Sequence, residues 1–176
     1  GAMIYASLAA MQQATGFRVQ DTQGLNAADT ATFVGIALMV SSILAVSMQA
    51  GLIQWLKWPP KRLLVVGAVC GLAGGLLLTT TESYLLIVVG VGFLGASFGM
   101  MNPAYTAALT LSAEPGEQGA VLGFNGTVQG LGFTIGALIG GGLYQVAPTL
   151  PYWCIAGFAV VSLTVSLLIK MPDPTA

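Results

Sequence analysis

A few uncharged polar side chains lie inside long apolar stretches of this sequence. The clearest examples are Gln12, Asn102 and Asn125. Amide groups in such surroundings can hydrogen-bond to a polar ligand, or they can join neighbouring helices with about 0.6 kcal/mol per hydrogen bond. For a single amide the second interpretation is the better one. The three amides together favour a shared binding hollow.

A proline directly follows one of these amides. Pro103 has no backbone N–H, so a carbonyl in the preceding helical turn is left without its usual partner. A free carbonyl is tolerated at membrane depth where it lines a cavity. Phe98, Met100 and Met101 lie close by in the sequence and would suit an apolar, adaptable ligand. They would suit a dry core equally well.

The sequence contains no pattern for enzymatic catalysis. It has no histidine, no cluster of metal-ligating residues and no phosphate-binding loop. We therefore expect a protein that is not an enzyme and that uses neither a metal nor a cofactor. The net charge of −1 gives no reason to expect a nucleic-acid partner.

The composition indicates an integral membrane protein. Hydrophobic residues make up 56% of the chain and charged residues only 6%, whereas soluble domains carry about 25% charged residues. A transmembrane helix needs about 20 mostly apolar residues. No predicted span has an ionisable residue in its interior, so this chain alone offers no obvious proton carrier.

Six apolar stretches predict an all-α, polytopic membrane protein with six transmembrane helices in one unit, residues 1–176. Residues 18–29 are predicted to be a polar connection in which Asp29 or Thr30 caps the next helix. The short first stretch suggests a fragment that lacks an N-terminal half. The predicted spans are 1–17, 31–52, 63–80, 84–111, 119–146 and 152–169.

The glycine-rich fifth stretch is expected to be a closely packed helix in the middle of the bundle. It is free of charge from Gly119 to Tyr144, and its glycines recur three or four residues apart. Small residues at this spacing let neighbouring transmembrane helices approach backbone to backbone. Asn125 and Gln129, one turn apart, would form a polar spot directed into the bundle.

Lysine and arginine residues predict the orientation in the membrane. Lys57, Lys61 and Arg62 follow the second span, and Lys170 follows the sixth. Cytoplasmic loops carry an excess of these residues. We therefore expect this basic turn and both ends of the six-helix unit to lie in the cytoplasm.

The pattern resembles the C-terminal half of a major facilitator superfamily transporter, most like the drug:proton antiporters of the tetracycline-efflux type. Residues 136–143 are similar to the GPxxGGxL motif, with Ala137 in place of proline. Gly51 and the basic turn resemble a degenerate copy of the GxLaDRxGRR motif, in which Trp55 and Trp58 replace aspartate and glycine. Similar phrases occur at 17–21, 99–103 and 117–119.

The resemblance covers essentially the whole chain and equates its spans with the seventh to twelfth helices of such transporters. It implies a carrier of two six-helix halves that holds its substrate between them near the midplane. The first and fourth spans would line the cavity, and the second and fifth would flank it. The implied substrate-binding residues are Tyr5, Gln12, Gln13, Met39, Ser42, Phe98, Met101, Asn102, Asn125 and Gln129.

The function that this resemblance implies is proton-coupled export of a small amphipathic molecule from bacteria across the inner membrane. The expected partners are the N-terminal half, the lipid bilayer, the small-molecule substrate and protons. An uptake carrier for a small metabolite, a membrane scaffold or receptor that does not transport, and a six-helix half that dimerises into a whole carrier remain as alternatives.

Overall fold

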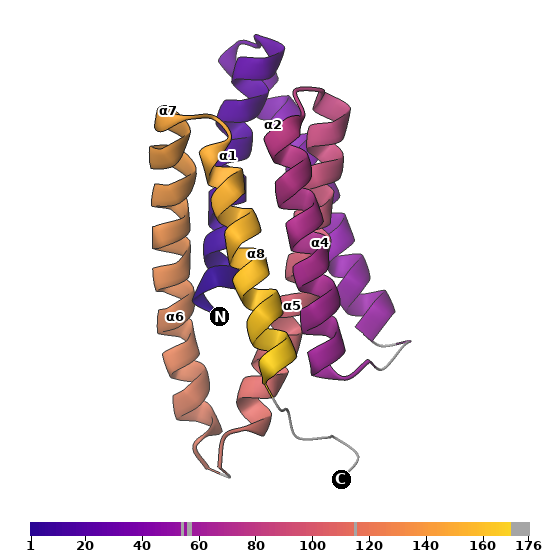
Figure 1. Cartoon of the computed structure of the whole chain (residues 1–176), viewed down its shortest axis with the longest axis vertical. Helices are drawn as coiled ribbons and strands as arrows, with labels where there is room; N and C mark the ends of the chain where they lie inside the picture. The colour runs from indigo at the N-terminus through magenta and orange to yellow at the C-terminus, as the bar shows by residue number, and fades with distance from the viewer. Residues whose placement is uncertain (54, 56–57, 115, 170–176) are drawn as a thin grey trace.

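The computed structural model describes all residues except 54, 56–57, 115 and 170–176 (Figure 1). The described residues form helices joined by short connections, which confirms the predicted all-α class. Six of the helices are long. The elements are α1 (Ala2–Gln23), α2 (Ala27–Ser47), η1 (Met48–Ile53), α4 (Pro60–Thr80), α5 (Tyr84–Leu111), α6 (Gln118–Leu138), η2 (Ile139–Leu143), α7 (Tyr144–Val146) and α8 (Leu150–Leu168).

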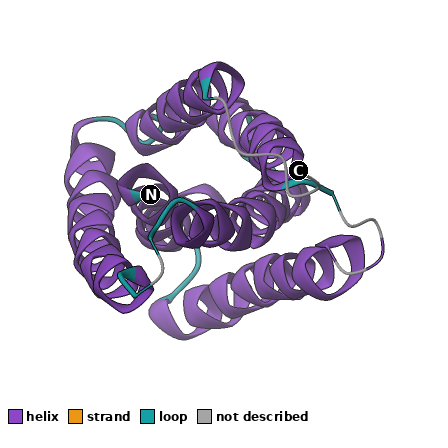
Figure 2. Ribbon diagram, turned by 90° about the horizontal axis from the view of Figure 1, so that it is seen from below, coloured by secondary structure: helices purple, strands orange, loops and turns teal. Residues whose placement is uncertain are grey.

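The two central helices of the bundle are α1 and α5, which pack against each other (Figure 2). Helix α6 packs along α1, and α2 packs along α5. Helices α4 and α8 contact each other, α4 also packs on α5, and α8 packs on α1. Residues on α1 and α5 therefore lie where most of the other helices meet.

Glycines on one face of α6, and Gly140 in η2, which continues this helix, allow a close approach to α1. A Cβ atom at Gly140 would lie 2.7 Å from the carbonyl oxygen of Ala10, and one at Gly136 would overlap the backbone of Ala6. Gly132 makes the same kind of contact one turn earlier. A larger side chain would force the two helices apart. The other glycines in the first part of α6 have open space beside them: Gly119, Gly123, Gly126 and Gly130.

Two glycines on α5 allow the close approach of α2 in the same way. A Cβ atom at Gly95 would overlap the backbone of Ser41, and one at Gly99 would overlap that of Ala45. The long helix α5 continues through Pro103 without interruption. The central helices are thus held at close range by glycine on both sides.

Five helices of the described part of the chain are long and apolar enough to cross a membrane: α2, α4, α5, α6 and α8. Helix α1 is not among them because it carries several polar residues. Its central place in the bundle explains this, since polar side chains there can face protein in place of lipid. Large apolar side chains such as Leu85 (69% exposed) and Phe124 (72%) lie on the outer surface. The chain is an integral membrane protein.

Lys61 and Arg62 of the basic turn lie at the same end of the bundle as the end of α8, whereas Lys57 and Lys170 lie outside the described residues. The Lys61 ammonium group donates hydrogen bonds to the carbonyl oxygens of Leu167 (3.2 Å) and Ile169 (3.0 Å). A cation there satisfies carbonyl groups that the helix end leaves free. The Arg62 guanidinium lies 4.1 Å above the ring of Trp58, in a cation–π contact.

The first helix is longer than predicted, and the expected polar connection is mostly helical. Helix α1 continues through Arg18 and ends at Gly24, which adopts a left-handed conformation with φ 61° and ψ 31°. Asn26 caps α2, because its side-chain oxygen accepts a hydrogen bond from the Asp29 backbone N–H at 2.9 Å. The prediction that Asp29 or Thr30 is the cap was therefore wrong.

Candidate functional site

Two of the predicted site residues are joined directly across the central helices. The hydroxyl group of Tyr5 on α1 donates a hydrogen bond to the side-chain oxygen of Asn102 on α5, at 2.6 Å. Tyr5 is only 3% exposed. The side chains of Tyr105 and Gln129 lie near the same hydroxyl group. Three helices, α1, α5 and α6, thus contribute polar groups to one place, and none of these groups carries a fixed charge.

Aromatic rings enclose this polar group. The ring of Phe98 meets that of Tyr5 edge-on, with centroids 5.9 Å apart and an angle of 71°. The ring of Phe133, from α6, also contacts the ring of Tyr5, with centroids 5.7 Å apart. A ligand that reached the Tyr5 hydroxyl would therefore meet aromatic surface and neutral hydrogen-bonding groups together.

Gln12 and Gln13 line a neighbouring hollow, further along α1. This open hollow of about 450 Å³ is also lined by Phe133, whose ring contacts that of Tyr5 as well. Gln12 lies seven residues from Tyr5, or about 10 Å along the helix axis. Neither Asn102 nor Asn125 is among the residues that line the hollow. The residues that line this hollow therefore come from α1 and α6, and the structure does not bring Gln12 into it together with the two asparagines.

Asn125 and Gln129 occupy different surroundings although they are one turn apart on α6. Gln129 faces Tyr5, as described above. Asn125 is 2% exposed, and its side-chain oxygen has no hydrogen-bond partner among the described residues. Of the two amides, Gln129 is therefore the one that lies near Tyr5.

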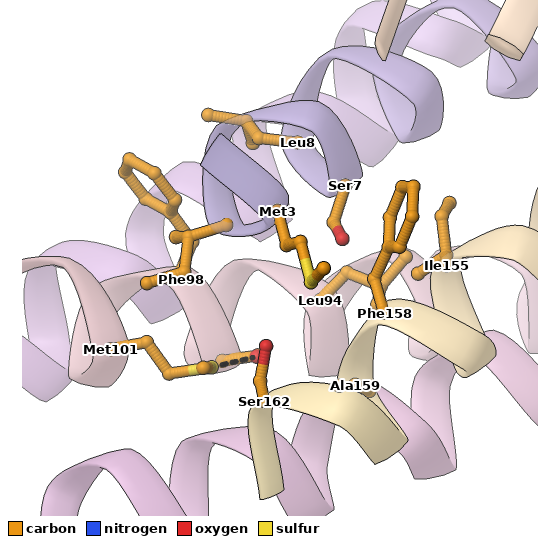
Figure 3. A pocket seen from close by; sticks show the side chains of 13 residues that line it. Met3, Ser7, Leu8, Leu94, Phe98, Met101, Ile155, Phe158, Ala159 and Ser162 are labelled. Carbon is orange, nitrogen blue, oxygen red and sulfur yellow. Dashed lines mark hydrogen bonds between the residues drawn. The ribbon is translucent and has the colours of Figure 1, made fainter. Parts of the chain in front are cut away.

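Met101 lies in the apolar core between α4 and α5. It is 5% exposed, and a Cβ atom at Gly67 of α4 would lie 2.5 Å from its Cγ. Its sulfur accepts a hydrogen bond from the hydroxyl group of Ser97 at 3.5 Å. Met101 and Phe98 also border a small cavity of about 30 Å³ between α1, α5 and α8, which Figure 3 shows. This cavity lies close to the Tyr5 group, because Phe98 also contacts the ring of Tyr5.

The two predicted residues on α2 do not join the Tyr5 group. Met39 is 56% exposed. Ser42 is exposed as well, and its hydroxyl group donates to the Leu38 carbonyl oxygen of its own helix at 2.9 Å. Both side chains lie on the outer face of α2, where they are available to lipid or to another part of a larger protein.

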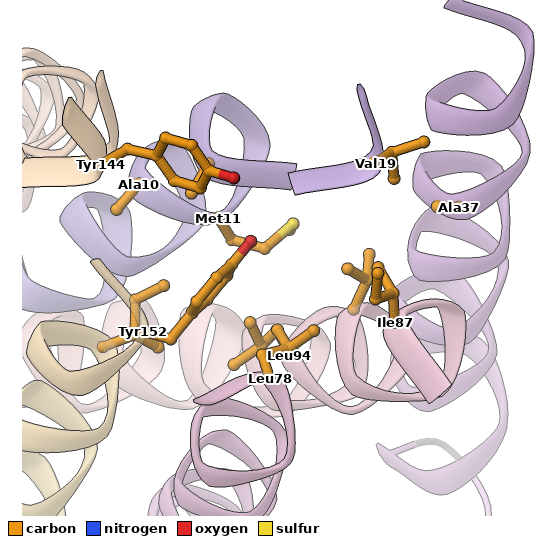
Figure 4. Close-up of a cluster of buried hydrophobic side chains, with 12 residues drawn as sticks. Ala10, Met11, Val19, Ala37, Leu78, Ile87, Leu94, Tyr144 and Tyr152 are labelled. Atoms are coloured by element: carbon orange, nitrogen blue, oxygen red, sulfur yellow. The ribbon is translucent and has the colours of Figure 1, made fainter. Parts of the chain in front are cut away.

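A second polar group, which was not predicted, lies at the end of α1. The Arg18 guanidinium is buried (6% exposed) and donates through Nη2 to the carbonyl oxygen of Thr81 at 2.7 Å. The hydroxyl group of Tyr144 donates to the Asp21 carboxylate at 2.9 Å. Tyr152 is fully buried beside Arg18. Figure 4 shows the Tyr144 and Tyr152 side chains directed toward α1.

The sequence held two signals for this second group. Thr15, Arg18 and Val19 continue the buried face of α1 at helical spacing, and Gly24 is a typical residue just after a helix end. The prediction ended the first span at residue 17 because it was based on hydropathy alone. The predicted span 1–17 has no ionisable residue, but the helix that contains it extends further and includes Arg18 and Asp21.

Comparisons with known proteins agree with this arrangement. The family model described as Major Facilitator Superfamily matches residues 1–176. Multidrug resistance protein 2 of Bacillus subtilis is 27% identical over 138 residues, which are 78% of this chain and 34% of the relative. Multidrug resistance protein 1 of the same organism is 32% identical over 95 residues, which are 54% of this chain and 23% of the relative.

The chain spans about a third of the length of the curated relatives it matches. The family model, by contrast, matches this chain from its first described helix to its last residue. The chain belongs to the Major Facilitator Superfamily.

Proposed function

We propose that this chain is the C-terminal half of a membrane transporter that exports small amphipathic molecules. Its partner is an N-terminal half with six further helices, and the substrate crosses between the two halves by alternating access driven by protons. Family membership and the names of the two multidrug resistance relatives support this proposal. Family membership also confirms the prediction that the chain is not an enzyme.

The observation that carries the proposal is the Tyr5–Asn102 hydrogen bond inside a partly aromatic surrounding. Its two helices are the central ones of the bundle. A hydroxyl, two amides and aromatic rings can bind many amphipathic molecules, because they impose no fixed charge and little shape selection. Gln12 and Gln13, across Phe133, extend the same kind of surface along α1.

The proposed location is the bacterial inner membrane, with the basic turn and the end of α8 in the cytoplasm. The contact between Lys61 and the last carbonyl groups of α8 supports placing these two segments on the same side. Basic residues at a membrane end favour the cytoplasmic side. The Tyr144 end of the bundle would then face outward.

The test uses the full-length protein in cells loaded with a fluorescent amphipathic cation. Asn102→Ala removes the acceptor of the Tyr5 hydroxyl, and we expect the apparent affinity for the dye to fall about fivefold, as the loss of about 1 kcal/mol of binding requires. Thr164→Val is the matched control, because the hydroxyl group of Thr164 is exposed on α8 and donates to the Val160 carbonyl oxygen of its own helix. The efflux rate as a function of dye concentration measures both. Unchanged efflux by Asn102→Ala, at equal amounts in the membrane, would remove this residue from the site.

A second measurement separates a transporter from a membrane scaffold with the same fold. A cysteine placed at position 102 should react with a membrane-impermeant thiol reagent, since a substrate path must admit water. The dye should protect this cysteine. Lack of labelling from both sides of the membrane would favour a scaffold.

A further inference from the structure

Hydrogen bonds join the last two turns of α1 to two other segments, the α4–α5 turn and α7. Arg18 donates to the Thr81 carbonyl oxygen in the turn between α4 and α5, at 2.7 Å. Gln23 donates to the Glu82 carbonyl oxygen in the same turn, at 3.0 Å. Tyr144, from α7, donates to Asp21 at 2.9 Å. These bonds join residues between 59 and 123 positions apart in the chain.

Side-chain packing supports the same attachment. The ring of Phe17 stacks on that of Tyr144, with centroids 5.4 Å apart and an interplanar angle of 29°. Tyr152 of α8 is fully buried, and it lies beside Thr15 and Arg18. The end of α1 is therefore enclosed by the α4–α5 turn, α7 and α8 together.

A buried arginine needs a specific reason, because removing a guanidinium from water is expensive unless its hydrogen bonds are replaced. Arg18 replaces part of them with a backbone carbonyl that belongs to a turn. Such a bond is directional and fixes the helix end at one point. Apolar side chains could fill the same space, but they would not fix the position of the helix end.

We propose that Arg18 is a positioning residue: it fastens the end of α1 so that α1, with Tyr5, moves as a rigid body with the other helices of this chain. This inference rests on the proposed transport function. Tyr5 lies 13 residues from Arg18, or about 20 Å along the helix. Helix α1 contains no proline and is continuous over this distance. Holding its far end therefore sets where Tyr5 meets Asn102, and α1 does not bend alone to close the site.

The first test asks whether Arg18 holds the helix end, and it does not depend on transport. Cysteines replace Gln23 and Glu82 in the full-length protein after removal of its native cysteines, and a short thiol cross-linker joins them. We expect Arg18→Gln to slow cross-linking about tenfold, the effect of losing one charged hydrogen bond. Arg18→Lys should restore most of the rate, since an ammonium group can donate to the same carbonyl.

A matched cysteine pair at the other end of the bundle controls for general loss of structure. Lys61 contacts the Ile169 carbonyl oxygen at 3.0 Å, so cysteines at 61 and 169 report on the contact between α4 and α8. Their cross-linking should be equal in the Arg18→Gln protein and its parent. If Arg18→Gln leaves the 23–82 rate unchanged, or slows both pairs alike, the positioning role is wrong.

The second test asks whether the attachment persists during transport. We expect efflux by the cross-linked 23–82 protein to stay within about twofold of the uncross-linked protein, because a rigid unit needs no motion at this contact. Efflux that stops on cross-linking and returns on cleavage of the linker would show that α1 bends alone, and would overturn the inference. Absence of efflux in the parent protein would instead contradict the proposed function.

Discussion

Helix α1 carries two polar groups that differ in charge, depth and partners. The middle group joins Tyr5 to the side chain of Asn102, without any ionised residue. The end group joins Arg18 to a backbone carbonyl and Asp21 to the hydroxyl of Tyr144. Two neutral side chains can give up their mutual hydrogen bond and bind a ligand instead, at little cost in free energy. A buried charge, by contrast, must keep its hydrogen-bond partners. On the proposed function, the middle group therefore binds the substrate and the end group holds α1 in place.

The largest effect on the middle group is expected from a substitution that pushes α6 away from α1. Gly136→Leu should destabilise the protein by about 3 kcal/mol or prevent folding, because its side chain would overlap the backbone of Ala6. The Tyr5 group should be lost first, since Gln129 and Phe133 lie on α6. Thermal unfolding in detergent measures the effect. Gly126→Leu is the control, because open space surrounds Gly126, and equal losses for the two variants would contradict the packing described here.

A smaller effect is expected from removing the charge of the end group. Arg18→Gln should lower the free energy of unfolding by about 2 kcal/mol, the value of a hydrogen bond from a charged donor in buried surroundings. Arg62→Gln is the matched control, because Arg62 is exposed and should cost less than about 1 kcal/mol. Denaturation in detergent compares the two. If Arg62 proves the more important residue, the end group does not hold α1.

The smallest stability effect is expected in the middle group. Tyr5→Phe removes one neutral hydrogen bond and keeps the ring contacts with Phe98 and Phe133, so about 0.6 kcal/mol should be lost. The same change should weaken dye binding measurably. A loss in stability as large as that of Arg18→Gln would show that the Tyr5–Asn102 bond holds the helices together and does not serve a ligand.

The sequence predicted several elements correctly because one physical cause dominated each of them. Helix α5 begins and ends at the predicted residues, since a long, mostly apolar stretch without charged residues has no alternative to a helix in lipid. The end of α1 was missed because burial by protein, which hydropathy does not measure, makes Arg18 acceptable inside a helix. Helical periodicity was the better guide there.

The structure brings some of the predicted site residues together, and their role in binding a substrate stays a prediction. Tyr5, Asn102 and Gln129 do lie together, as expected for the first, fourth and fifth spans. Gln12 lies in a separate hollow, and Met101 lies in the core. Which face of α5 meets α1 depends on how Gly67, Gly95 and Gly99 seat the neighbouring helices, and a single sequence does not contain that rotation.

The sequence by itself determined that lipid is the solvent, that helices are the only possible elements and that the chain is built for close helix packing. These properties follow from composition and spacing along the chain. Only the tertiary structure decided which glycines meet a neighbour, which amide faces Tyr5 and where Arg18 finds a partner. The physical reason is that hydrogen bonds between distant segments depend on helix rotation and depth, which many side chains set together.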